Sequence, residues 1–74
     1  MRWQVQYLVV IEKGPSSFGA YVPDLPGVIA TGKTKAMVEK NIFSAIQFHI
    51  EGLKEENMRI PKAHAESEIL EFPL

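Results

Sequence analysis

The 74-residue sequence contains no cysteine. This absence excludes disulfide bonds, thiolate metal sites and cysteine nucleophiles together. Small secreted domains usually depend on disulfides, so the composition favours a cytoplasmic protein. The sequence also lacks an apolar run near the ~20 residues that cross a bilayer, and its first residues lack the apolar core of a secretory signal. We therefore expect a protein that is neither inserted in a membrane nor secreted.

Residues that commonly perform catalysis are few. The chain has a single aspartate, Asp24, and two histidines, His49 and His64. A metal-dependent nuclease needs several carboxylates around its metal ions, and the sequence has neither a phosphate-binding glycine loop nor a serine-hydrolase elbow. We expect Asp24 to act as a turn residue whose carboxylate accepts nearby backbone N–H groups. The sequence predicts a protein that is not an enzyme and that binds no cofactor or metal.

The length indicates one small domain, which we assign to residues 1–74. Such a domain has a stability of about 3–5 kcal/mol, so self-association is an expected source of further stability. The net charge of −1 gives no basic field for nucleic acid. The charge is unevenly distributed, because residues 51–74 carry three basic and six acidic groups. This acidic end is either simply solvated or a surface that meets a basic partner.

Apolar and β-branched residues predict three strands, over residues 3–11 (beginning at Trp3), 18–22 and 28–31. Between the second and third strands, two prolines remove backbone donors and interrupt the pairing. The sequence predicts a tight turn there, with a positive φ at its glycine. The turn consists of Pro23, Asp24, Leu25, Pro26 and Gly27.

A helix of about 20 residues is predicted after the third strand. Gly32 ends that strand, Thr34 is a suitable N-cap, and Asn57 suits a left-handed stop. A final strand is predicted over residues 66–72, with Ile69 as its apolar anchor. The apolar stripe of the helix consists of Val38, Ile42, Ala45, Ile46, His49 and Leu53.

The element order β-β-β-α-β predicts an α+β two-layer sandwich, in which one helix covers one face of a small, mostly antiparallel sheet. The chain offers no helix for the other face, so we expect a second copy or another partner to cover it. The residues expected on that uncovered face are Leu8, Val10, Ala20 and Val22.

Several ordered motifs resemble the HicB-like antitoxin family. They are the aromatic opening strand, the turn at residues 23–27, Gly32 with Thr34 at the helix start, and Ile60-Pro61 after the helix. Within the helix, Asn41-Ile42, Ala45-Ile46 and Glu51-Gly52-Leu53 extend the resemblance, which covers nearly the whole chain.

This resemblance implies a degraded ribonuclease H-like fold without catalytic carboxylates. It also implies an antitoxin that binds and neutralises a small basic, mRNA-cleaving toxin of the HicA type. Many members carry a C-terminal DNA-binding domain, whereas this sequence stops at Leu74, so we expect no such domain and no operator binding.

An acidic surface complements a basic toxin. The candidate partner-binding residues are Glu55, Glu56, Glu66, Glu68 and Glu71. Two alternatives stay open at this point. One is a homo-oligomeric binding or regulatory module without a toxin partner, and the other is a residual nuclease that depends on Asp24.

Overall fold

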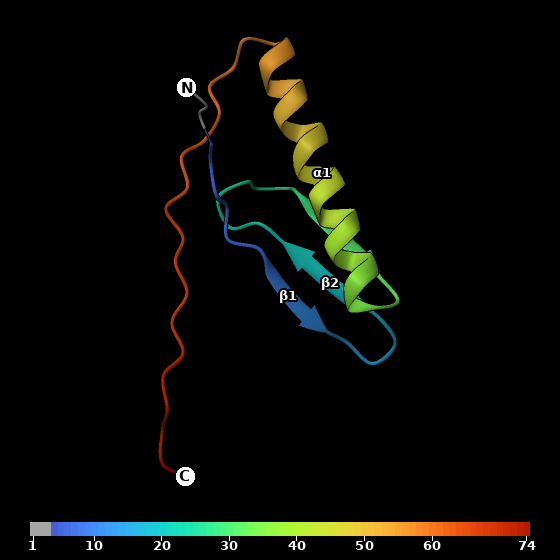
Figure 1. Ribbon diagram of the computed structural model, residues 1–74, viewed down its shortest axis with the longest axis vertical. Coiled ribbons are helices and arrows are strands. Elements are labelled where there is room, and N and C mark those ends of the chain that lie inside the picture. The colour runs from blue at the N-terminus through green and yellow to red at the C-terminus, as the bar shows by residue number, and fades with distance from the viewer. Residues whose placement is uncertain (1–3) are drawn as a thin grey trace.

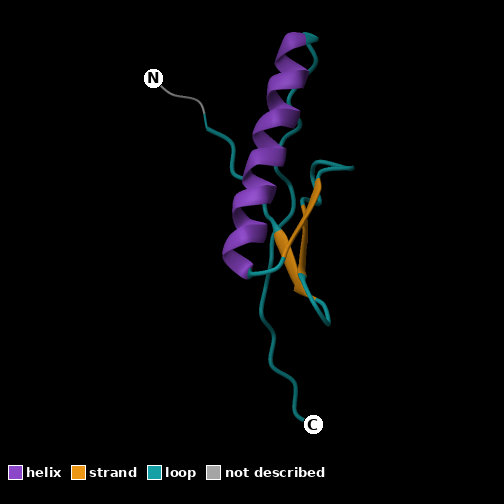
Figure 2. Cartoon of the chain, turned by 90° about the vertical axis from the view of Figure 1, so that its right-hand side faces the viewer, coloured by secondary structure: helices purple, strands orange, loops and turns teal. Residues whose placement is uncertain are grey.

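The computed structural model describes residues 4–74, so the expected start of the first strand at Trp3 lies outside the described residues. Three strands precede one helix: β1 (Val10–Lys13), β2 (Phe18–Tyr21), β3 (Ile29–Gly32) and α1 (Lys35–Glu55). The strands form an antiparallel sheet in the order β1-β2-β3. The helix lies across one face of this sheet (Figure 1, Figure 2). The predicted α+β arrangement is confirmed; its likeness to ribonuclease H stays a prediction.

The first strand is shorter than predicted, because β1 begins at Val10 rather than near residue 3. Its first residue pairs with Tyr21, the last residue of β2. Beyond Tyr21 the chain enters the turn at Pro23, which has no N–H to offer. The segment before Val10 therefore has no partner strand in β2, although its sequence has a strand pattern.

The core lies between the sheet and α1. Its fully buried centre is formed by Leu25 from the turn and Val38 from the helix, and Ile42 follows one helical turn later. Tyr7, Val9 and the helix residues Ala45 and Ile46 pack around this centre and are only partly buried. The part of the predicted helix stripe from Val38 to Ile46 is thus the face that packs on the core. The complete buried set is Ala20, Val22, Leu25, Val38, Ile42 and Val28.

The prediction that Ala20 and Val22 lie on the uncovered face is wrong, because both are buried in the core. The register places Ile11, Ala20 and Ala30 in one row across the sheet, and all three contact the core beneath α1. The neighbouring row therefore faces away from the helix. It consists of Val10, Tyr21 and Ile29, which the register pairs directly.

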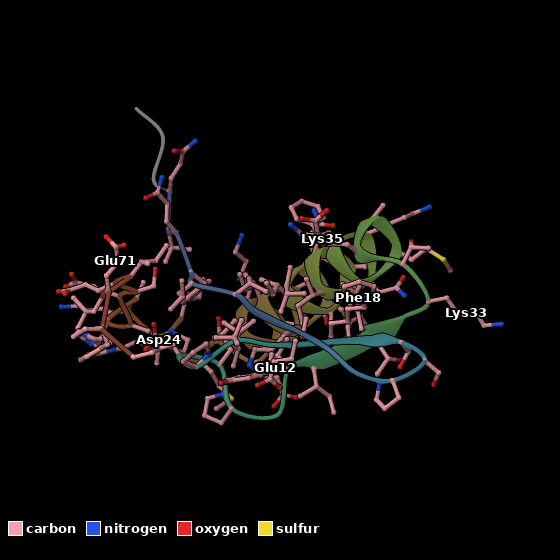
Figure 3. All side chains as sticks on the ribbon, turned by 90° about the horizontal axis from the view of Figure 1, so that it is seen from below. Glu12, Phe18, Asp24, Lys33, Lys35 and Glu71 are labelled. Carbon is pink, nitrogen blue, oxygen red and sulfur yellow. The ribbon has the colours of Figure 1, made fainter. Side chains whose placement is uncertain are left out.

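Figure 3 looks along the long axis of the molecule and separates the two faces of the sheet. Phe18 lies between the strands and the helix, whereas Glu12 lies on the opposite side of the sheet. Within residues 4–74, no helix combines the length and apolarity needed to cross a bilayer.

The predicted final strand at residues 66–72 is not formed, because the sheet contains only β1, β2 and β3. The segment is extended and exposed along its whole length (Figure 1). A strand requires a neighbour that accepts and donates its backbone hydrogen bonds. The pattern of residues 66–72 is that of a strand, but none of the described residues pairs with it.

Candidate partner-binding surface

The turn at residues 23–27 is built around a buried leucine. The Leu25 N–H donates to the Val22 carbonyl over 3.0 Å, and the Val28 N–H donates to the Leu25 carbonyl over 3.1 Å. These two hydrogen bonds direct Leu25 into the core, where its side chain is 0% exposed. Gly27 has a φ of +88°, which confirms the predicted positive φ at this glycine.

Asp24 connects this turn to the C-terminal segment. One carboxylate oxygen, Oδ2, accepts the backbone N–H of His64 over 2.9 Å and that of Ala65 over 3.0 Å. The expectation that this carboxylate accepts backbone N–H groups is correct, but the donors lie 40 and 41 residues away rather than nearby. We refer to this pair of hydrogen bonds as the Asp24 clasp.

A second contact holds the same segment. The Tyr7 hydroxyl donates to the Pro61 carbonyl. Burial raises the pKa of Tyr7, and the negative charge of Asp24 raises it further, so the hydroxyl keeps its proton and remains a donor at neutral pH. Sequence reasoning did not identify this contact, because nothing in the pattern relates residues that are 54 positions apart. Residues 61–65 are therefore fixed to the body of the domain, and residues 66–74 extend beyond it.

The Asp24 clasp is expected to depend on pH. The N–H groups of Ala65 and His64 hold the pKa of Asp24 below its ordinary value of 3.8. A lowered folded-state pKa means that the stabilisation is complete above the ordinary pKa and is lost as the pH falls through the folded-state value. We therefore expect hydrogen-exchange protection of the His64 and Ala65 amides to fall as the pH drops below the ordinary pKa of 3.8 and through the folded-state pKa of Asp24.

The control amide is that of Met58, which donates to the Leu53 carbonyl over 2.8 Å and has no titratable partner. Its protection should change little over the same range. In an Asp24→Asn variant, the His64 and Ala65 amides should show weak protection at every pH. Protection of these two amides in the unmodified chain that is no stronger than in the Asp24→Asn variant would contradict the clasp.

The helix start has the predicted cap. Thr34 is the N-cap, and its hydroxyl oxygen accepts the Met37 N–H over 3.1 Å. Gly32 lies against this first helical turn so closely that a Cβ there would come within 2.6 Å of the Val38 nitrogen. At the other end, Asn57 has a φ of 56° and ends the helix as predicted.

The five candidate glutamates are all exposed and lie in two separate places. Glu55 ends α1 and Glu56 caps it, whereas Glu66, Glu68 and Glu71 follow the Asp24 clasp on the extended segment (Figure 1). Figure 3 shows Glu71 on the side of the molecule opposite Lys33 and Lys35 at the helix start. The charge asymmetry of the sequence is therefore also an asymmetry in space.

Apolar surface is more prominent than charge at the edge of the sheet. A groove of about 270 Å³ lies between β1 and α1, and all but one of its lining residues are apolar. Sequence reasoning missed this groove, because the periodicity of the helix does not show how far the helix lies from the edge strand. The groove is lined by Val9, Ile11, Glu39, Ile42, Phe43 and Ile46.

The model of one family, described as the HicB-like antitoxin of bacterial toxin–antitoxin systems, matches residues 7–73. The chain belongs to this family. The match includes the turn at residues 23–27, the helix and the extended C-terminal segment, so the resemblance inferred from the motifs is confirmed.

Two curated relatives of this HicB-like chain differ in length. A UPF0150 protein of Thermoplasma acidophilum is 41% identical over 63 residues, which cover 84% of this chain and 91% of the relative. An uncharacterised 14.9 kDa protein from the rep-hol intergenic region of Haemophilus phage HP1 is 34% identical over 67 residues. That alignment covers 90% of this chain and half of the phage protein. No solved structure matches the chain significantly.

Among the residues that the structure describes, the acidic and histidine side chains of this HicB-like chain form no group suited to a metal. Within residues 4–74, no three such residues come together in a way that would hold an ion. The carboxylate of Asp24 is instead engaged by two backbone N–H groups.

Proposed function

We propose that this HicB-like chain is an antitoxin that binds and neutralises a small basic, mRNA-cleaving toxin of the HicA type in the cytoplasm. The observation that carries the proposal is the family match over residues 7–73. We also propose that the chain is not an enzyme. The engagement of Asp24 in the clasp supports this, because a metal-dependent nuclease needs free carboxylates that converge on its metal.

The acidic groups suggest how the toxin is recruited. A toxin that cleaves mRNA must attract phosphates, so its binding field is positive and attracts carboxylates as well. Glu66, Glu68 and Glu71 lie on the exposed segment beyond the clasp, where they are accessible from several directions. We propose that these three glutamates attract the toxin to the extended segment, and that Glu55 and Glu56, in their separate place at the helix end, add to the attraction.

Binding to a catalytically inactive HicA-type toxin tests this function. We expect a complex that protects RNA from the active toxin, and we expect a Glu66→Lys, Glu68→Lys variant to associate roughly tenfold more slowly at low salt. The difference should shrink near ~0.5 M salt, because exposed charges are screened there within about 4 Å.

The matched control is a Glu12→Lys, Glu39→Lys variant, which makes the same change in net charge at two exposed positions outside residues 51–74. Its association rate should fall less. Absence of any complex with the toxin would contradict the antitoxin function. If a complex forms but its association rate changes with neither the charge reversal nor the salt, the antitoxin function stands. Recognition would then use the apolar surfaces instead.

A second candidate is a homo-oligomeric binding module without a toxin partner. The row of Val10, Tyr21 and Ile29 across the open face of the sheet favours it. Tyr21 and Ile29 are exposed there, and a second copy would bury this apolar surface. A gene for a small basic protein next to the gene for this chain favours the antitoxin, and its absence favours the module.

A further inference from the structure

The chain exposes more surface than a compact protein of its size. Its accessible surface is 6658 Å², whereas a folded monomer of 8.3 kDa exposes about 4,600 Å². Its radius of gyration is 14.5 Å, compared with about 11 Å for a compact domain of this length. The excess of about 2,000 Å² exceeds the ~800 Å² that each partner contributes to a standard interface. The extended C-terminal segment accounts for the molecule's length (Figure 1, Figure 2).

The β1 edge of the sheet can pair with another strand. β1 is an edge strand, with β2 on one side and no described strand on the other. An exposed edge presents unpaired N–H and C=O groups that can pair with an added strand. On the helix side of this edge lies the apolar groove of about 270 Å³, and on the open face lies the row that begins with Val10. An added strand would therefore meet apolar surface on both of its faces.

The C-terminal segment carries apolar side chains that would face both of the apolar surfaces beside β1. Successive side chains of a strand point to opposite faces, so Leu70 and Phe72 lie on one side and Ile69 on the other. All three are exposed, and Ile69 is 96% exposed. Beside β1, Leu70 and Phe72 would fill the groove, while Ile69 would extend the row of Val10, Tyr21 and Ile29. Residues 66–72 span about 23 Å when extended, which is longer than the four residues of β1.

We propose that two copies of this chain exchange their C-terminal segments, so that residues 66–72 of each copy pair with the β1 edge of the other and close its apolar groove. The Asp24 clasp supports the exchange, because it fixes Ala65 and thereby sets where the segment leaves the body. From there the segment runs past the end of its own sheet (Figure 2). In a symmetric dimer of this kind, each copy covers the groove of the other, so neither groove stays open.

Cross-linking separates exchange from pairing within one chain, and the lack of cysteine makes the chain suitable for it. One chain would carry Leu70→Cys, and a second, distinguishable by a tag, would carry Ile11→Cys. Exchange predicts a disulfide between the two chains after mixing and oxidation. The control replaces Ile11→Cys by Thr31→Cys on β3, at the opposite edge of the sheet, and should give little product.

Sedimentation of the full chain, without toxin, gives an independent reading. We expect the unmodified chain to be a dimer, and a Leu70→Glu, Phe72→Glu variant to raise the dimer dissociation constant at least about 100-fold. Both side chains are exposed within one chain, so the variant should keep its circular dichroism. The control Phe48→Glu, on the exposed side of α1, should leave the dimer intact.

Three results would overturn the exchange. The first is a disulfide that forms only when Leu70→Cys and Ile11→Cys are in the same chain. The second is a dimer unaffected by the two glutamates at positions 70 and 72. The third is a monomer at high micromolar concentration of the unmodified chain. Each is measured without the toxin, so it leaves the proposed antitoxin function untouched.

Discussion

Replacing Leu25 by alanine should lower the free energy of unfolding by about 3–5 kcal/mol and leave most of the protein unfolded at 25 °C. Leu25 is completely buried, although it lies in a turn rather than in a strand or helix. The substitution removes three carbon atoms and leaves a cavity in the core that Leu25 shares with Val38. A domain of this size has a total free energy of unfolding of only about 3–5 kcal/mol, so the expected loss is comparable to that total. Chemical denaturation followed by circular dichroism measures it.

The control for this prediction is Phe48→Ala. It removes a larger apolar side chain that is 80% exposed on α1, so the free energy of unfolding should change by less than about 0.5 kcal/mol. A Leu25→Ala variant that melts like the unmodified protein would show that the turn is not part of the core. If the chain dimerises, the free energy of unfolding measured for each variant increases with protein concentration. The two variants should therefore be compared at the same concentration.

Replacing Gly32 by alanine should cost roughly 2–3 kcal/mol, for a steric reason rather than a conformational one. The added Cβ would lie 2.6 Å from the Val38 nitrogen and 3.0 Å from the Met37 carbonyl carbon. Both are backbone atoms of the first helical turn, so the helix start itself must shift. Thermal denaturation should show a large fall in Tm, and the N-cap hydrogen bond between Thr34 and Met37 should be weakened.

Replacing Gly52 by alanine is the matched control, and it should change the stability in the opposite direction. A Cβ there meets no heavy atom within 4 Å, and Gly52 lies inside α1. Alanine is the better helix former by about 1 kcal/mol, so Gly52→Ala should raise the stability. Equal effects at the two positions would show that the close approach of β3 to α1 at Gly32 has no energetic consequence.

The features that the sequence predicted correctly depend on residues close together in the chain. The positive φ at Gly27, the cap at Thr34 and the helix end at Asn57 each follow from one residue and its immediate neighbours. The helix face that packs on the sheet follows from the 3.6-residue period of its apolar positions. These determinants are local, so no knowledge of the tertiary structure was required.

The features that the sequence did not reveal depend on distant partners. Asp24 suited a turn, but its N–H donors are about 40 residues away. The faces of β2 were assigned wrongly because apolar residues occur on both sides of it, so alternation alone did not show that Ala20 points toward the helix. Residues 66–72 were assigned to the sheet by their pattern, but a pattern does not supply the neighbouring strand.

The extended C-terminal segment also affects how the protein would be degraded. Proteases cleave exposed, extended chain ends most readily. Cleavage just after Ala65 would remove Glu66, Glu68 and Glu71 together with Leu70 and Phe72, but none of the buried core residues. The remaining domain would stay folded while losing the groups proposed for toxin recruitment and chain exchange. The lifetime of the active protein would then depend on the accessibility of residues 66–74 rather than on the stability of the fold.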